Sequence, residues 1–94
     1  MIIKQVQRYG QLGLSKALWP HKNGLVTMRP TTEGILLLRF VMGDEYEPET
    51  YVTKISHNYR VNLPIKYRRK YNIQSAVEIV RLAGEQLLIQ YHQA

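Results

Sequence analysis

The two halves of this 94-residue chain can be aligned with each other as an internal repeat. The aligned stretches differ by only two residues in the connecting loop. The alignment pairs Val6 with Ile55, Gln11 with Arg60, Leu12 and Leu14 with Val61 and Leu63, Val26 and Met28 with Val77 and Ile79, and Leu36, Leu37 and Leu38 with Leu87, Leu88 and Ile89. We therefore predict a degenerate first copy over residues 1–42, an acidic linker over residues 43–50 and a second copy over residues 51–92.

The size of each copy limits how it can fold. Each copy has roughly 45 residues, close to the limit of about 40 below which a lone core is seldom enough. A separate copy would also leave strand edges unpaired. Interleaving the hairpins of both copies into one closed barrel hides edges and pools apolar surface. We therefore expect one mainly-β domain over residues 1–94, a barrel of two ββαββ-type repeats with one short helix each.

Hydrophobic periodicity predicts short strands separated by turns. A single helical turn over residues 15–19 is stopped by Pro20. A short helix opens at Pro64, where the missing N–H costs nothing, and Asn72 suits a left-handed cap at its end. The expected strands are residues 3–6, 11–14, 25–28, 35–40, 51–56, 60–63, 76–82 and 86–91.

Charge is segregated along the chain. Thirteen Lys and Arg against seven Asp and Glu give a formal net charge of +6, which favours polyanionic partners. Four acids fall in the linker: Asp44, Glu45, Glu47 and Glu49. Between Lys54 and Lys70 there are six basic residues and no acidic one. This distribution favours a dedicated anion-binding face. The linker is then either a solvated connector or a shield for that face.

Residues 52–73 read VTKISHNYRVNLPIKYRRKYNI, a strand, a turn, an arginine, an alternating strand ending in Leu-Pro, and a short basic helix. This segment resembles the core motif of the AbrB/MazE/SpoVT family, and most closely the AbrB-type transition-state regulators. The tail AVEIVRLAGEQLLIQY looks like the family's closing hairpin. Two copies in one chain are similar to the arrangement in MraZ-type proteins. The resemblance implies a swapped-hairpin (double-ψ-like) barrel that grips DNA with arginines.

Carried over by position, the resemblance assigns DNA contacts to Arg60, Arg68 and Arg69. An exposed arginine fork can bind phosphate or a guanine edge. Four basic residues of the predicted helix fan around its axis, so some of them are merely solvated. The full candidate set for DNA binding is Arg60, Arg68, Arg69, Lys66, Lys70, Lys54 and Arg8.

The chain also departs from the family pattern. Thr53 stands where a basic residue is frequent, Asn58 and Tyr59 replace an acidic-Leu-Gly turn, and Asn72 replaces a glycine. The first copy has Gln11 in place of Arg60 and no second arginine pair; Leu18 and Trp19 fall near the place of that pair. The DNA-binding face is therefore either half-sized in each chain or doubled by dimerisation.

The seven tyrosines are dispersed. We expect Tyr67, Tyr71 and Tyr91 to pack in the core or at the barrel rim, and Trp19 to plug the barrel. Tyr59, at a predicted turn tip, is the best candidate for stacking on a base.

Catalytic and metal chemistry find no support in the sequence. The absence of cysteine excludes disulfides, Cys-based zinc sites and a thiol nucleophile. His21, His57 and His92 are isolated from one another, and Ser15, Ser56 and Ser75 have no evident base partner. We expect no enzyme activity, cofactor, metal or small-molecule substrate. No apolar run suits a signal peptide or a membrane span, so we expect a soluble, cytoplasmic protein.

The sequence thus predicts a double-stranded DNA-binding protein, a transcriptional regulator that forms a homodimer or a higher homo-oligomer. The alternative is a protein-interaction module on the same fold. It would be an antitoxin of the MazE type, although only a few residues follow the last strand, or a phage or plasmid protein that binds a host protein. Whether the barrel closes within one chain or between two stays open at this point.

Overall fold

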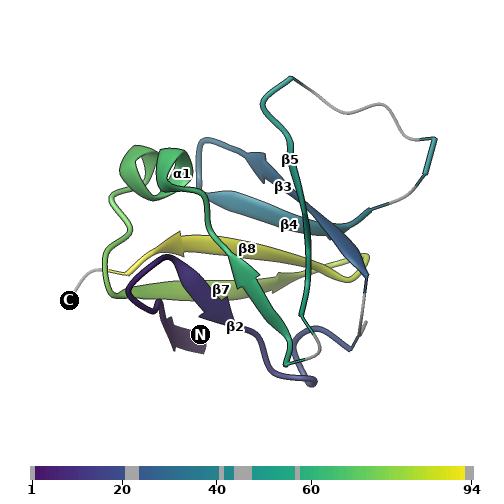
Figure 1. Cartoon of the computed structure of the whole chain (residues 1–94), viewed down its shortest axis with the longest axis horizontal. Helices are drawn as coiled ribbons and strands as arrows, with labels where there is room; N and C mark the ends of the chain where they lie inside the picture. Colours follow the sequence, from purple (N-terminus) through teal and green to yellow (C-terminus); the bar gives the residue numbers. More distant parts are fainter. Residues whose placement is uncertain (1, 21–23, 41, 44–47, 57, 93–94) are drawn as a thin grey trace.

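The computed structural model describes residues 2–20, 24–40, 42–43, 48–56 and 58–92 (Figure 1). The structure does not describe residues 1, 21–23, 41, 44–47, 57 and 93–94. Predictions that concern His21, His57 and the linker acids Asp44, Glu45 and Glu47 therefore lie outside the described residues. Within them the chain is mainly β, as predicted, and each strand end falls within two residues of its predicted place. The elements are β1 (Ile2–Gln5), β2 (Gln11–Gly13), β3 (Leu25–Pro30), β4 (Ile35–Arg39), β5 (Tyr51–Lys54), β6 (Arg60–Asn62), α1 (Ile65–Lys70), β7 (Ala76–Leu82) and β8 (Gln86–Tyr91).

The strands form two antiparallel sheets. Six strands pair in the order β1-β7-β8-β4-β3-β5, and β2 pairs with β6 in a separate two-stranded ribbon. In Figure 1 the ribbon lies in front of the large sheet, and α1 follows β6 at one end of the molecule. The prediction of a closed barrel was wrong, because β1 and β5 are sheet edges. Among the described residues, the ribbon is joined to these two edge strands by the isolated bridge Val6–Leu12 and by turn hydrogen bonds such as Ser56 N–H to Arg60 O, not by a continuous ladder.

Strand pairing connects the two halves of the chain. β1 pairs with β7, β3 with β5, β2 with β6 and β4 with β8. The registers follow the offsets of the sequence alignment, which are 49 residues early in the halves (6 to 55) and 51 later (26 to 77). For example, Ile2 pairs with Ile79. The equivalents of these two residues in the other half are Tyr51 (49 later) and Met28 (51 earlier), and they pair with each other too. The ladders are therefore related by a pseudo-twofold axis that passes near Leu12 and Val61, which face each other.

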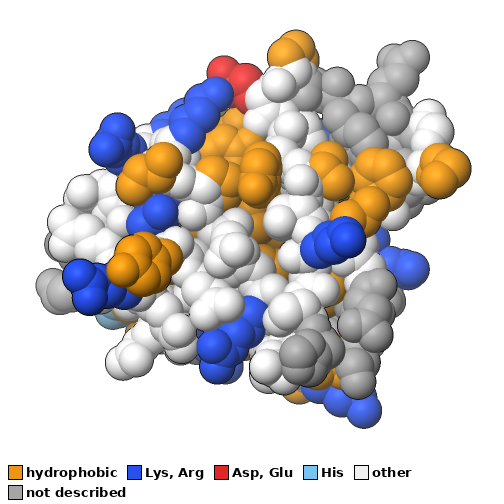
Figure 2. Space-filling view, in the orientation of Figure 1, with side chains coloured by type: hydrophobic (Ala, Val, Ile, Leu, Met, Phe, Trp, Pro, Cys, Tyr) orange, Lys and Arg blue, Asp and Glu red, His pale blue; other side chains and the backbone are white. Residues whose placement is uncertain are grey.

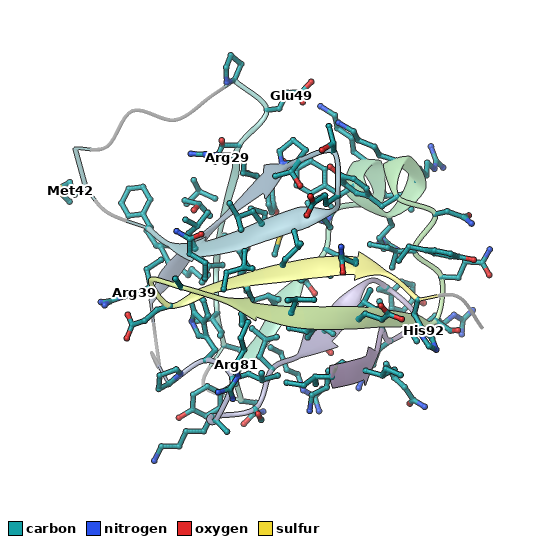
Figure 3. All side chains as sticks on the ribbon, turned by 180° about the vertical axis from the view of Figure 1, so that it is seen from behind. Arg29, Arg39, Met42, Glu49, Arg81 and His92 are labelled. Atoms are coloured by element: carbon teal, nitrogen blue, oxygen red, sulfur yellow. The ribbon has the colours of Figure 1, made fainter. Side chains whose placement is uncertain are left out.

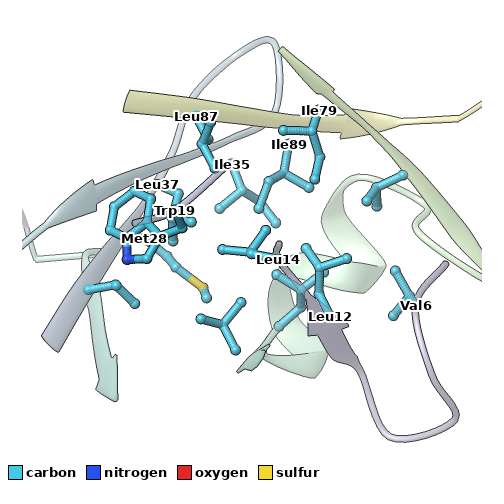
Figure 4. Close-up of a cluster of buried hydrophobic side chains, with 14 of the residues drawn as sticks. Val6, Leu12, Leu14, Trp19, Met28, Ile35, Leu37, Ile79, Leu87 and Ile89 are labelled. Atoms are coloured by element: carbon cyan, nitrogen blue, oxygen red, sulfur yellow. The ribbon is translucent and has the colours of Figure 1, made fainter. Parts of the chain in front are cut away.

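The core draws on both halves. Leu12, Val26, Met28, Ile35, Leu37, Val77 and Ile89 are fully buried in one contiguous cluster. Figure 4 shows side chains from the ribbon and from the large sheet meeting in it. Trp19, which we expected to plug a barrel, is 1% exposed in the same cluster and packs in the core between the two sheets. Neither half has a core of its own, so burial of apolar surface holds the halves together.

The prediction of one short helix in each half was wrong for the first half. There the N–H groups of Leu18 and Trp19 both donate to Ser15 O, at 3.0 and 2.9 Å, and a single turn results. In the second half the N–H groups of Tyr67 and Arg68 donate in the same way to Pro64 O, and α1 continues. Pro20 causes the difference, because it has no N–H and disfavours the helical conformation of the residue before it.

α1 has six residues, begins after Pro64 and is followed by Asn72 in the left-handed conformation (φ 54°), as predicted. Its last turn carries Arg68, Arg69 and Lys70, the charge that the negative end of a helix favours. Among the described residues no helix has the length and apolar character that crossing a membrane requires.

Candidate nucleic-acid interface

The β2–β6 ribbon presents polar side chains on its outer face. Leu12 and Val61 point into the core, so their neighbours along each strand point outward. Gln11 lies opposite Asn62, and Gly13 lies opposite Arg60. The exposed Arg60 donates from Nη1 to Gln11 Oε1 at 3.2 Å. Gln11, the equivalent of Arg60 in the first half, thus accepts the hydrogen bond that orients the Arg60 guanidinium.

A tight turn over residues 7–10 adjoins the ribbon. Gln7 N–H donates to Gln11 O, and Gly10 N–H donates to Gln7 O, both at 2.8 Å. Gly10 has φ 85°, a left-handed conformation that glycine adopts without strain. Arg8 and Tyr9 form the exposed tip, with the Arg8 guanidinium carbon 5.6 Å from the Tyr9 ring centroid. Arg8 therefore lies beside the ribbon although it precedes Arg60 by half the chain.

Arg68 is the most firmly held of the predicted arginines. Its side chain is half-buried, and Nε donates to Leu63 O at 3.0 Å. The same guanidinium lies against Gly10, where a Cβ would be 2.7 Å from Nε. Arg8, Arg60 and Arg68, which we call the arginine surface, are therefore gathered around the ribbon from both halves of the chain.

The remaining basic candidates surround α1 or lie on β5. Lys66 and Arg69 are exposed on α1. Lys70 Nζ lies 4.0 Å from Glu49 Oε2 and 5.6 Å from the Tyr71 ring centroid, so one acid of the linker contacts the basic helix. Lys54 is exposed opposite Leu25, at the edge of the large sheet, and lines a separate hollow there.

Among the described residues, the arginine surface has no acidic partner. Within the part of the chain that the structure describes, no carboxylate forms an ion pair with Arg8, Arg60, Arg68 or Arg69; the pairs seen are Lys70–Glu49 and His92–Glu78. Figure 2 shows Lys and Arg side chains spread over this face, while the acidic side chains coloured in this view lie at its upper edge. Unpaired cations at a surface are available to a polyanion.

Tyr67 of α1 and Tyr71, the residue after it, fix the helix to the first half of the chain and to the linker. The Tyr67 hydroxyl has the carbonyls of Met28 and Glu49 within hydrogen-bonding reach and can donate its one proton to either. The Tyr71 hydroxyl donates to Thr31 O at 2.6 Å. Burial raises the pKa of both hydroxyls, and the carboxylate of Glu49 raises it further. Neutral hydrogen bonds therefore help to position the basic helix, beside the exposed Lys70–Glu49 pair.

The sequence missed part of this site. Tyr59, the best candidate for stacking in the sequence, is half-buried and packs against the core with φ 58°. The exposed aromatic ring is Tyr9, 79% exposed. Tyr91, expected to pack, is 47% exposed. The glycine after Tyr9 was the available signal, because a turn that ends in glycine places the preceding residue at a tip.

No known protein family, curated protein or solved structure matches this chain. Among the described residues, no three His, Asp or Glu side chains gather at metal-ligand spacing.

Proposed function

We propose that the chain binds double-stranded DNA through the arginine surface and α1, and acts as a transcriptional regulator. The observation that carries this proposal is the convergence of Arg8, Arg60 and Arg68 on the β2–β6 ribbon, with no carboxylate paired to them in the described residues. Duplex DNA offers a dense row of phosphates to such a surface.

The ribbon supplies a means of reading a groove. A two-stranded ribbon fits the major groove, where an arginine recognises guanine and a carboxamide recognises adenine. Arg60, Gln11 and Asn62 all point outward from the ribbon. Arg69 and Lys66, exposed on α1, would bind phosphates and set the orientation of the protein.

The strand pairing between halves supports a swapped-hairpin fold of the AbrB/MazE/SpoVT kind. In such a fold each copy lends a strand to the other, and here β1 pairs with β7 while β5 pairs with β3. We infer on this basis that the halves are two copies of one unit. We also propose a cytoplasmic location, because a regulator of this kind acts where it meets bacterial DNA.

The two copies differ at the arginines. Gln11, Trp19 and Pro20 stand at the positions that the repeat equates with Arg60, Arg68 and Arg69. One chain thus carries a single basic half of the pseudo-twofold face. We propose that a homodimer supplies the second half for a site with two half-sites.

A protein-binding role is favoured by one observation. The edge strands β1 and β5 expose Ile3 (51%) and Val52 (40%), which are equivalent positions of the repeat. Exposed apolar edges accept an added strand from another chain. Such an edge suits either the dimer or a host protein.

Salt-dependent titration of fluorescent duplex DNA tests the proposal. Each phosphate neutralised contributes about −0.9 to the slope of log affinity against log salt. Arg60→Ala should weaken binding and flatten the slope by about that amount. Arg39→Ala is the matched control, because Arg39 is an exposed strand arginine away from α1 (Figure 3) and should change neither. Absence of binding at low salt would remove the DNA proposal and leave the protein-binding one.

A further inference from the structure

A hollow lies between the tight turn and the outer face of the ribbon. It is lined by Gln7, Arg8, Tyr9, Gln11 and Asn62, and its volume is about 410 Å³. This volume falls in the range of sites for small organic groups. None of the described residues that line it is acidic.

The lining combines three kinds of chemistry. Tyr9 offers an aromatic ring that is 79% exposed, with a guanidinium near it. Gln7, Gln11 and Asn62 bring carboxamides, each with donors and an acceptor. Arg8 brings a positive charge. A nucleotide has the complementary parts, because it joins a flat ring with donors and acceptors on its edge to an anionic phosphate.

The hollow is held in shape before any ligand binds. Gln11 Oε1 is engaged by Arg60 Nη1, which leaves the amide nitrogen of Gln11 as the donating group. The turn is fixed by the contact of Gly10 with Arg68 and by the Leu63 N–H, which donates to Gly10 O at 2.8 Å. A site that is already ordered loses less entropy when it binds.

We propose that this hollow binds one unstacked base of single-stranded DNA, with Tyr9 stacked on the base, the carboxamides at its edge and Arg8 at its phosphate. A base inside a duplex is stacked on both faces and cannot lie on a tyrosine ring. The inference rests on the proposed nucleic-acid binding and adds a preference to it: the chain binds a single strand, or a duplex with an unpaired base, more tightly than a fully paired duplex.

The test uses a thymine oligonucleotide with one central 2-aminopurine, alone and annealed to its complement. Wild-type protein should bind the single strand more tightly than the duplex and change the 2-aminopurine fluorescence. Tyr9→Ala should weaken single-strand binding about 5- to 150-fold, the contribution of one base stacked on an aromatic ring, and should leave duplex affinity nearly unchanged. Tyr9→Phe keeps the ring and should behave as wild type. Because Tyr9 is exposed, both variants should keep the fold, and circular dichroism checks this.

Two other outcomes overturn this inference alone, and a third overturns the proposed function as well. Binding of the duplex with no preference for the single strand overturns the inference and leaves duplex binding intact. Equal weakening of both affinities in Tyr9→Ala also overturns it, because the ring would then contact a paired groove. Failure to bind either DNA overturns both.

Discussion

Gly10 packs directly against Arg68: a Cβ at Gly10 would lie 2.7 Å from Arg68 Nε and 2.7 Å from Leu63 O. The contact joins the turn of the first half to the helix of the second. Gly10 and Tyr59 are equivalent in the repeat, and both have positive φ. Their backbones are also linked in the same way, because Leu14 N–H donates to Tyr59 O and Leu63 N–H donates to Gly10 O, at 2.7 and 2.8 Å.

Gly10→Ala should therefore destabilise the protein and weaken DNA binding. A left-handed alanine costs about 1–2 kcal/mol, and displacing the packed neighbours adds about 1–3 kcal/mol. Gly84→Ala is the matched control, because Gly84 has φ 75° but its nearest neighbouring atom lies 3.8 Å from the Cβ position. Urea unfolding followed by the fluorescence of the single, buried Trp19 measures both variants. Equal losses in the two variants would mean that Arg68 moves aside freely.

Gln11→Glu should reduce DNA affinity without harming the fold. The new carboxylate takes the place of the amide oxygen that accepts from Arg60 Nη1 at 3.2 Å, and it neutralises that arginine. We expect stability within about 1 kcal/mol of wild type, since the pair is exposed. The salt slope for duplex DNA should flatten by about 0.9. Gln74→Glu makes the same charge change at another exposed position. An equal loss of affinity in Gln74→Glu would point to net charge rather than to Arg60.

Glu49→Gln should strengthen DNA binding. Lys70 and Glu49 lie 4.0 Å apart with side chains 49% and 60% exposed, so their ion pair contributes little to stability, about 0–1 kcal/mol. Without the carboxylate Lys70 is available to a phosphate, and the salt slope should steepen by up to about 0.9. Glu33→Gln removes the same charge from an exposed side chain outside the ion pairs of the described residues. If the two variants bind DNA alike, Glu49 does not shield Lys70.

The strands and the core could be predicted because they depend on local alternation. Leu12, Val61 and their neighbours alternate with polar residues, and that pattern alone fixes which side chains are buried. The alignment of the halves also placed residues that face each other across the pseudo-twofold axis, such as Leu12 and Val61. Where a twofold axis passes between two equivalent strands, the equivalent residues beside the axis face each other. A repeat therefore carries information on strand pairing.

The errors concern geometry between elements. Closure of the barrel requires a partner strand for both β1 and β5, and periodicity along the chain does not record which strands pair. Tyr59 and Tyr9 both belong to turns, and burial decides between them only once the helix and core are in place. The carboxamide of Asn62 joined the site because β6 pairs with β2, a contact between distant parts of the chain.

Alkaline pH should loosen α1 because its anchors are neutral hydroxyls. Burial raises the pKa of Tyr67 and of Tyr71 above the ordinary value of 10.0, and the charge of Glu49 raises both further. A raised pKa in the folded state means that the stabilisation is complete below about pH 10, the pKa of tyrosine in the unfolded chain, and is lost as pH rises through the folded-state pKa.

The fluorescence of Trp19 and the tyrosinate absorbance, followed together above pH 9, measure this loss. Wild type should unfold as its last tyrosines ionise. Tyr67→Phe/Tyr71→Phe should start from a lower stability, since buried carbonyls lose their donors at about 1–3 kcal/mol for each unsatisfied group. Its stability should then fall less steeply over the same pH range, because the two raised groups no longer ionise. An equal slope in wild type and variant would show that other groups govern the alkaline transition.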